Sequence, residues 1–148
     1  MIQKIIDGLN AREKKYIAKA ISILENNTSQ SEKLLNQISL NKSHSVRIGI
    51  TGPPGAGKST ITNQLIKKIR KNNKSVCALL VDPSSPFTNG AVLGDRIRMQ
   101  DFHKDDNVFI RSIASRGSKG GLSENIENIT NVLNYCKFDV IIFETVGI

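Results

Sequence analysis

The fold of this chain is decided at residues 52–59, which read Gly-Pro-Pro-Gly-Ala-Gly-Lys-Ser. The stretch matches the pattern G-x-x-x-x-G-K-[ST] in full, through Gly52, Gly57, Lys58 and Ser59. An apolar run of β type, 46–51, precedes the stretch, and a segment with helical periodicity, 58–72, follows it. A strand, this loop and a helix in that order predict a phosphate-binding loop (P-loop) for a nucleoside triphosphate.

The residue types of the loop suit the binding of phosphate oxygens. Glycine lets the main chain come close to the anion and adopt positive φ. A helix that begins near Lys58 directs its N–H groups and positive dipole end at the phosphates, and the lysine adds a mobile cation. Ser59 offers a hydroxyl to Mg²⁺, which binds few protein ligands. The residues that we expect to bind the nucleotide are Gly52, Pro54, Gly55, Ala56, Gly57, Lys58, Ser59 and Thr60.

Strand-like and helix-like segments alternate after residue 45. Apolar runs predict strands at 46–51, 76–81, 108–113 and 140–143. Helical stripes lie between them, formed by Ile61, Leu65 and Ile69 and then by Leu122, Ile126, Ile129 and Leu133. This alternation predicts an α/β protein with a mainly parallel sheet and right-handed crossovers, the three-layer fold of P-loop NTPases. The last strand has little chain after it, so we expect an exposed sheet edge there.

The first 40 residues predict a short helical extension. Apolar residues recur at helical spacing in two groups, Ile2, Ile5, Ile6 and Leu9, then Ile17, Ala20, Ile21 and Leu24. Ser29 with Glu32 predicts a capping box for a third helix that buries Leu34, Leu35 and Ile38. We therefore divide the chain into a helical extension with a polar linker, 1–45, and a P-loop domain, 46–148.

Acidic residues near the strand ends are candidates for metal binding and for orienting the attacking group. Asp82 and Glu144 each follow an apolar strand, and Asp95 lies in the long loop between two strands. Because ligands of open α/β sheets bind beyond the carboxyl ends of the strands, we expect Asp82 and Glu144 beside the P-loop. With Ser59 these acids form the predicted Mg²⁺ site, and with Lys58 the predicted catalytic group. The alternative for each acid is a hydrogen-bonded loop residue.

The segment 83–95 predicts a loop that orders around the γ-phosphate, because long loops in compact domains are often functional. Within it, Thr88 is a candidate contact to Mg²⁺ or phosphate, and a surface threonine is the alternative. A short helix is expected near 96–102. Gly147, in the string Glu-Thr-Val-Gly, is a candidate sensor of the γ-phosphate through its N–H, with a plain turn glycine as the alternative.

Composition limits the possible partners. The chain has 148 residues and a net charge of +8, but the basic pairs are scattered over predicted helices, which is typical of a solvated surface. Aromatic residues make up 5%, which argues against stacking on nucleic-acid bases. Cys77 and Cys136 have no metal-site spacing, so we expect buried thiols. No apolar run reaches membrane length, so we expect a cytoplasmic protein without a membrane partner.

Several strings of the chain closely resemble the MeaB/ArgK GTPases, the metallochaperone-type P-loop GTPases that accompany methylmalonyl-CoA mutase. The strings lie at 52–60, 81–88, 93–99, 109–117, 120–123 and 144–147. The resemblance covers about residues 46–148. Their occurrence together and in order is far more specific than the P-loop alone.

The resemblance implies Mg²⁺-dependent GTP hydrolysis to GDP that gates loading or protection of a coenzyme-B12-dependent acyl-CoA mutase. It also implies that Lys58 and Ser59 bind phosphate and metal. Asp82, Asp95 and Glu144 fall on the family's acidic positions near Mg²⁺ and the attacking water. Homodimerisation is usual in the family, through a C-terminal extension that this chain lacks.

The chain departs from the family pattern at its end. It stops at Ile148, and the guanine-reading string N-K-x-D is absent, so we expect the N-terminal portion of a longer protein. Two other functions stay open at this point. One is an ATP-dependent small-molecule or transport-associated kinase or ATPase built on the same loop. The other is a fragment that binds nucleotide without turning it over.

Overall fold

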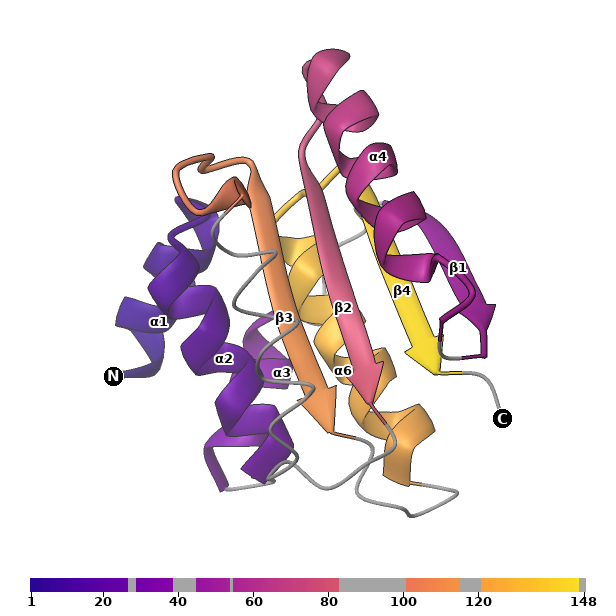
Figure 1. Ribbon diagram of the computed structural model, residues 1–148. Helices are drawn as coiled ribbons and strands as arrows, with labels where there is room; N and C mark the ends of the chain where they lie inside the picture. The colour runs from indigo at the N-terminus through magenta and orange to yellow at the C-terminus, as the bar shows by residue number, and fades with distance from the viewer. Residues whose placement is uncertain (27–28, 39–44, 54, 83–100, 115–120, 147–148) are drawn as a thin grey trace.

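A parallel β-sheet organises the chain (Figure 1). The computed structural model describes residues 1–26, 29–38, 45–53, 55–82, 101–114 and 121–146. Within them the sheet has four strands in the order β1-β4-β2-β3, namely β1 (Val46–Gly52), β2 (Val76–Asp82), β3 (Val108–Ala114) and β4 (Val140–Val146). Helix α4 (Lys58–Lys71) follows β1, and α6 (Gly121–Tyr135) follows β3. The predicted parallel α/β architecture is confirmed.

The last strand lies inside the sheet. β4 pairs in parallel with β1 on one side and with β2 on the other, so our expectation of an exposed edge at this strand is wrong. The physical reason is burial on both faces, since Val140, Ile141 and Ile142 are all buried. Among the described strands, β1 and β3 form the edges, and Val46 of β1 is 61% exposed.

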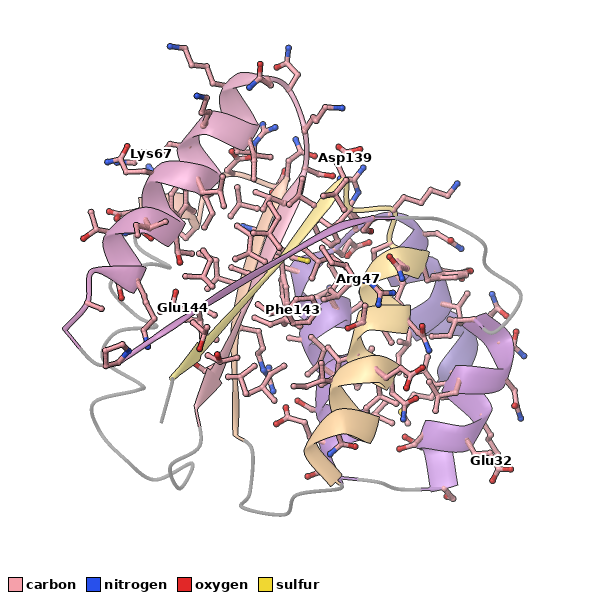
Figure 2. The ribbon with its side chains drawn as sticks, turned by 90° about the vertical axis from the view of Figure 1, so that its right-hand side faces the viewer. Glu32, Arg47, Lys67, Asp139, Phe143 and Glu144 are labelled. Atoms are coloured by element: carbon pink, nitrogen blue, oxygen red, sulfur yellow. The ribbon has the colours of Figure 1, made fainter. Side chains whose placement is uncertain are left out.

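The two faces of the sheet have separate apolar cores. On one face, Ile66 of α4 packs with Val76, Ala78, Val108, Ile110, Val140 and Ile142. On the other face, α6 packs with the N-terminal helices against Cys77, Leu79, Phe109, Ile113 and Ile141. Figure 2 shows Glu144 on the α4 side of the sheet and Phe143 on the opposite side. Alternation of side chains along a strand accounts for this division.

The helical extension shares a core with the sheet. Its helices are α1 (Ile2–Asn10), α2 (Lys14–Asn26) and α3 (Ser29–Ile38). The predicted apolar stripes are buried, with Ile5, Leu9, Ile17, Ile21 and Leu34 at most 1% exposed. These side chains belong to the same cluster as Ile129 and Leu133 of α6. Helix packing against α6 and β3 therefore stabilises the extension.

A polar contact adds to this packing at the edge of the sheet. Arg111 of β3 donates to the Ser22 hydroxyl and to Glu25 Oε1 of α2, each at 3.0 Å. The Arg111 and Glu25 side chains are 27% and 16% exposed, so the ion pair is partly shielded from water. It joins α2 directly to the strand that the helix covers.

Three expectations about the helices need correction. In α4 the predicted stripe included Ile61, but this side chain is 56% exposed, and Thr62 and Ile66 are the buried residues. Neighbouring residues of an α-helix are about 100° apart around its axis, so Ile61 and Thr62 lie on different sides of α4. The P-loop sets the direction in which α4 leaves β1, and this direction decides which side faces the sheet. In α3, Ser29 is the first helical residue and not the flanking cap. Leu35 is only partly buried.

Both cysteines are buried and free, as the sequence predicts. Burial raises the pKa of the Cys136 thiol to about 12, and it also raises the pKa of the Cys77 thiol well above its ordinary value. Both thiols are therefore protonated near neutral pH. Among the described residues, no helix is long and apolar enough to cross a membrane.

Hydrogen bonds between Ser75 and Asp139 hold the amino ends of three strands together. The Ser75 N–H and hydroxyl donate to Asp139 Oδ2 at 2.8 and 3.1 Å, and Asp139 N–H donates to Ser75 Oγ at 3.0 Å. The carbonyl of Ser75 accepts from Val140, and that of Asp139 accepts from Val46. The bond from Ser75 N–H, which is the largest cause, holds the pKa of Asp139 below its ordinary value of 3.8.

The pH dependence of stability tests this contact. Because the folded state lowers the pKa of Asp139, its contribution is present above about pH 3.8 and is lost as the pH falls through the folded value. We expect Asp139→Asn to lower the free energy of unfolding at pH 7, with the deficit shrinking below pH 4. Urea unfolding from pH 2 to 7 measures it, with the exposed Asp101→Asn as control. A deficit that stays constant with pH would contradict the assignment.

The shared core predicts that the extension and the sheet unfold together. We expect Ile21→Ala to cost about 2–5 kcal/mol, because it removes a fully buried side chain between α2 and the rest of the core. Ile61→Ala makes the same chemical change at an exposed position and should cost less than about 1 kcal/mol. Urea unfolding followed by circular dichroism measures both. Two separate transitions in the unmutated protein would show that the extension folds independently.

Candidate functional site

The P-loop turns the chain from β1 into α4. Gly55 and Gly57 have φ angles of +82° and +90°, in the left-handed region that favours glycine. Gly57 is the N-terminal cap of α4 and forms no side-chain cap bond. The first N–H groups of a helix lack intrahelical partners, so this end of α4 is suited to an anion.

Lys58 spans the carboxyl ends of two strands. Its ammonium donates to the carbonyl of Gly52, at 2.5 Å, and to the carbonyl of Thr145, at 3.1 Å. The first carbonyl belongs to β1 and the second to β4. The lysine is therefore held over the loop in a partly buried position, ready to exchange carbonyl oxygens for phosphate oxygens.

Glu144 lies within β4, two residues before the strand ends, and not after the strand as the sequence suggested. It is in register with Ile50 of β1 and Leu80 of β2. Its Oε2 accepts a hydrogen bond from the hydroxyl of Thr62, at 2.8 Å. Thr62 is fully buried on α4, one turn after Lys58. The carboxylate is thus tied to the helix that the P-loop starts.

The other predicted residues divide into two groups. Ser59 and Thr60 lie in the first turn of α4, and β2 ends at Asp82, on the same sheet edge as Gly52 and Glu144. Pro54, Thr88, Asp95 and Gly147 lie outside the described residues, as do the loop 83–95 and most of the short helix expected near 96–102. The structure therefore brings together the P-loop, Lys58, Ser59, Glu144 and the end of β2.

The sequence argument missed Thr62. The sequence feature that could have indicated it is the spacing of four residues between Lys58 and Thr62, which places both on the same side of the helix. The predicted apolar stripe ran through Ile61 instead, one position away from Thr62. Its partner Glu144 is 82 positions away in the chain, and only the folded sheet brings the two side chains together.

The described part of the site carries oxygen atoms of the kind that can hold a metal ion. These are the Ser59 hydroxyl and the Glu144 carboxylate, and the backbone of the neighbouring strand β2 ends at Asp82. Hydroxyl and carboxylate oxygens suit Mg²⁺, which usually binds through one or two carboxylates plus substrate phosphates. Among the described residues, no three His, Cys, Asp or Glu side chains gather into a metal-binding group.

A separate cavity of about 290 Å³ lies between α2 and β3. Its lining is mostly apolar and includes Ala18, Phe102, Val108, Phe109 and Ile110, with Lys14 and Lys15 beside them. It contains no residue of the P-loop and lies apart from the acids of the site.

A phosphate-binding loop between an edge strand of a parallel sheet and a helix, with an acid on the adjoining strand, defines a P-loop NTPase-type protein. The family model described as "Methylmalonyl Co-A mutase-associated GTPase MeaB" matches residues 17–148 of this chain. The chain belongs to this MeaB family.

Individual relatives agree with this family assignment. A protein of Pyrococcus horikoshii named "Putative GTPase PH0274" is 45% identical over 99% of this chain and 46% of its own length. GTPase ArgK of Escherichia coli is 35% identical over 97% of this chain and 44% of its own length. A solved structure titled "LAO/AO transport system kinase" matches with a TM-score of 0.77 and 26% identity, over 99% of this chain and 43% of that one. The chain thus spans about half the length of the curated relatives it matches.

Gly57→Ala tests the conformation of the loop. Apart from the chain neighbours of Gly57 and the backbone of its own helix, no described residue places an atom within 4 Å of the Cβ that alanine would add, so backbone strain at φ +90° is the expected cause of any effect. We expect a loss of about 1–2 kcal/mol in the free energy of unfolding, together with weaker nucleotide binding. Gly49→Ala is the matched control, because its Cβ also meets no atom within 4 Å and its φ is not positive. Equal effects of the two variants would contradict the assignment.

Proposed function

We propose that this protein binds GTP with Mg²⁺ and hydrolyses it to GDP and phosphate. The observation that carries the proposal is the joining of Lys58 and Glu144 to one P-loop, the lysine through two strand-end carbonyls and the acid through Thr62. Membership of the MeaB family supports the choice of GTP. The guanine preference rests on that family and not on a base-reading string in this chain.

Different residues of the site serve phosphate binding, metal binding and orientation of the attacking water. The N–H groups at the start of α4 and the ammonium of Lys58 bind the phosphates and balance the charge that develops during transfer. Ser59, Asp82 and Glu144 would hold Mg²⁺, which when bound neutralises phosphate charge. Glu144 orients the attacking water. The water oxygen bonds to the γ-phosphorus as the bond to the bridging oxygen breaks, which releases GDP and phosphate.

The use of this reaction is proposed from the family. We propose that the protein, working in the cytoplasm, assists a B12-dependent acyl-CoA mutase by gating the loading or protection of its cofactor, and that the full-length protein is a dimer. The name of the matching family, a mutase-associated GTPase, supports the partner. A Caenorhabditis elegans relative, 31% identical over 99% of this chain, is named as a homologue of methylmalonic aciduria type A.

A kinase is the second candidate, because a solved structure of the same fold is titled as a transport system kinase. A kinase would transfer the γ-phosphoryl group to an acceptor other than water. Titration with GTP and with ATP, each with and without Mg²⁺, separates the two candidates. A preference for ATP would overturn the proposal of a GTPase, and binding of GTP without phosphate release would leave a nucleotide-binding fragment.

Lys58→Ala tests the site itself. The variant removes the cation aimed at the phosphates, and charge-assisted hydrogen bonds of this kind correspond to about 10- to 100-fold in affinity. We expect that loss in the binding of a fluorescent GTP analogue. Lys67→Ala is the control, because Lys67 is exposed on the same helix and lies away from the P-loop (Figure 2). Unchanged affinity of Lys58→Ala would refute the assignment of the phosphate loop.

A further inference from the structure

We infer that Thr62 is a positioning residue that sets the orientation of the Glu144 carboxylate for hydrolysis, an inference that rests on the proposed GTPase function. The carboxylate oxygen Oε2 lies 2.8 Å from Thr62 Oγ1. Within the P-loop, the printed side-chain hydrogen bond of Thr62 goes to the backbone carbonyl of Lys58. Its effect on the reaction passes through Glu144.

The hydroxyl of Thr62 is held from two sides. Besides Glu144, it lies 2.9 Å from the carbonyl of Lys58, one helical turn earlier. Threonine in a helix chooses between two χ1 rotamers, and a contact with the carbonyl four residues earlier favours one of them. The side chain is fully buried, so its neighbours also restrict it. Thr62 Oγ1 is therefore a fixed point against which the carboxylate is aligned.

One hydroxyl proton serves two acceptors. A carboxylate accepts a shorter and stronger hydrogen bond than a neutral carbonyl does. The Lys58 carbonyl also has the N–H of Thr62 as its ordinary helical donor. The hydroxyl proton is therefore directed to Glu144 when this acid is ionised, and the bond fixes the direction of the carboxylate.

The buried side of α4 shows why a hydroxyl at this position points to the site. One turn later, Ile66 lies on the same side of the helix and packs in an apolar cluster with strand residues that include Val140 and Ile142. At the level of Thr62 the strand β4 presents Glu144 instead. Valine would occupy nearly the same volume as threonine, so the feature specific to Thr62 is a donor for that carboxylate.

Thr130 of α6 provides an internal comparison. It is 2% exposed, and its hydroxyl donates to the carbonyl of Ile126, four residues earlier, at 2.6 Å. A buried threonine in a helix is therefore satisfied by its own backbone. The carboxylate contact of Thr62 goes beyond that need and connects the P-loop helix with the acid on β4.

The test compares Thr62→Val, Thr62→Ser and Thr130→Val with the unmutated protein. Valine removes the hydroxyl and keeps the shape, whereas serine keeps the hydroxyl. We expect Thr62→Val to lower kcat for GTP about 10- to 100-fold, the effect of a misplaced catalytic group. Affinity for a non-hydrolysable GTP analogue should change less than about twofold. Thr62→Ser should recover most of kcat, and Thr130→Val should leave kcat unchanged.

Crystal structures of the unmutated protein and of Thr62→Val provide a readout that does not depend on turnover. We expect the Glu144 carboxylate to rotate away from α4 in the variant. A carboxylate that stays in place would overturn the inference even if the protein hydrolyses no GTP. Equal kcat in Thr62→Val and Thr130→Val would also overturn it, as would a loss of nucleotide affinity as large as the loss of kcat. Absence of GTP hydrolysis by the unmutated protein would refute only the proposed function.

Discussion

Parallel pairing of β4 between β1 and β2 is the constraint on which the site depends. In a parallel sheet all carboxyl ends point the same way, so Gly52, Thr145 and Asp82 meet at one edge. This insertion gives Lys58 two strand-end carbonyls to bind at once. It also sets Glu144 between Ile50 and Leu80, facing α4.

Helix α4 both packs in the core and carries residues of the site. Ile66 packs into the apolar cluster of the sheet, while Thr62, one turn earlier, binds the carboxylate. The first N–H groups of the helix lie one further turn back, next to the capping residue Gly57. A single helix thus couples the packing of the sheet to the positions of Lys58 and Glu144, because an α-helix bends little over two turns.

The opposite face is covered by a different set of helices. There the extension α1–α3 joins α6 over the strands, and Arg111 ties β3 to α2. The extension therefore contributes to the core that holds β2 and β3 in place, on the far side of the sheet from Glu144. Its role in the fold is to complete the burial that a parallel sheet requires on both faces.

Local patterns in the sequence determined the elements and the phosphate loop. Gly57 and Lys58 could be assigned from spacing alone, since a P-loop is built from consecutive residues whose backbone does most of the binding. The strands and the stripes around Ile5, Ile17 and Ile129 also follow from local periodicity. Tertiary structure alone decided the interior place of β4, the rotation of α4 that buries Thr62 and exposes Ile61, and the contact of Thr62 with Glu144. These features join residues far apart in the chain, such as Val46 with Val140 and Thr62 with Glu144, and such contacts depend on the order of strands in the sheet, which no local pattern encodes.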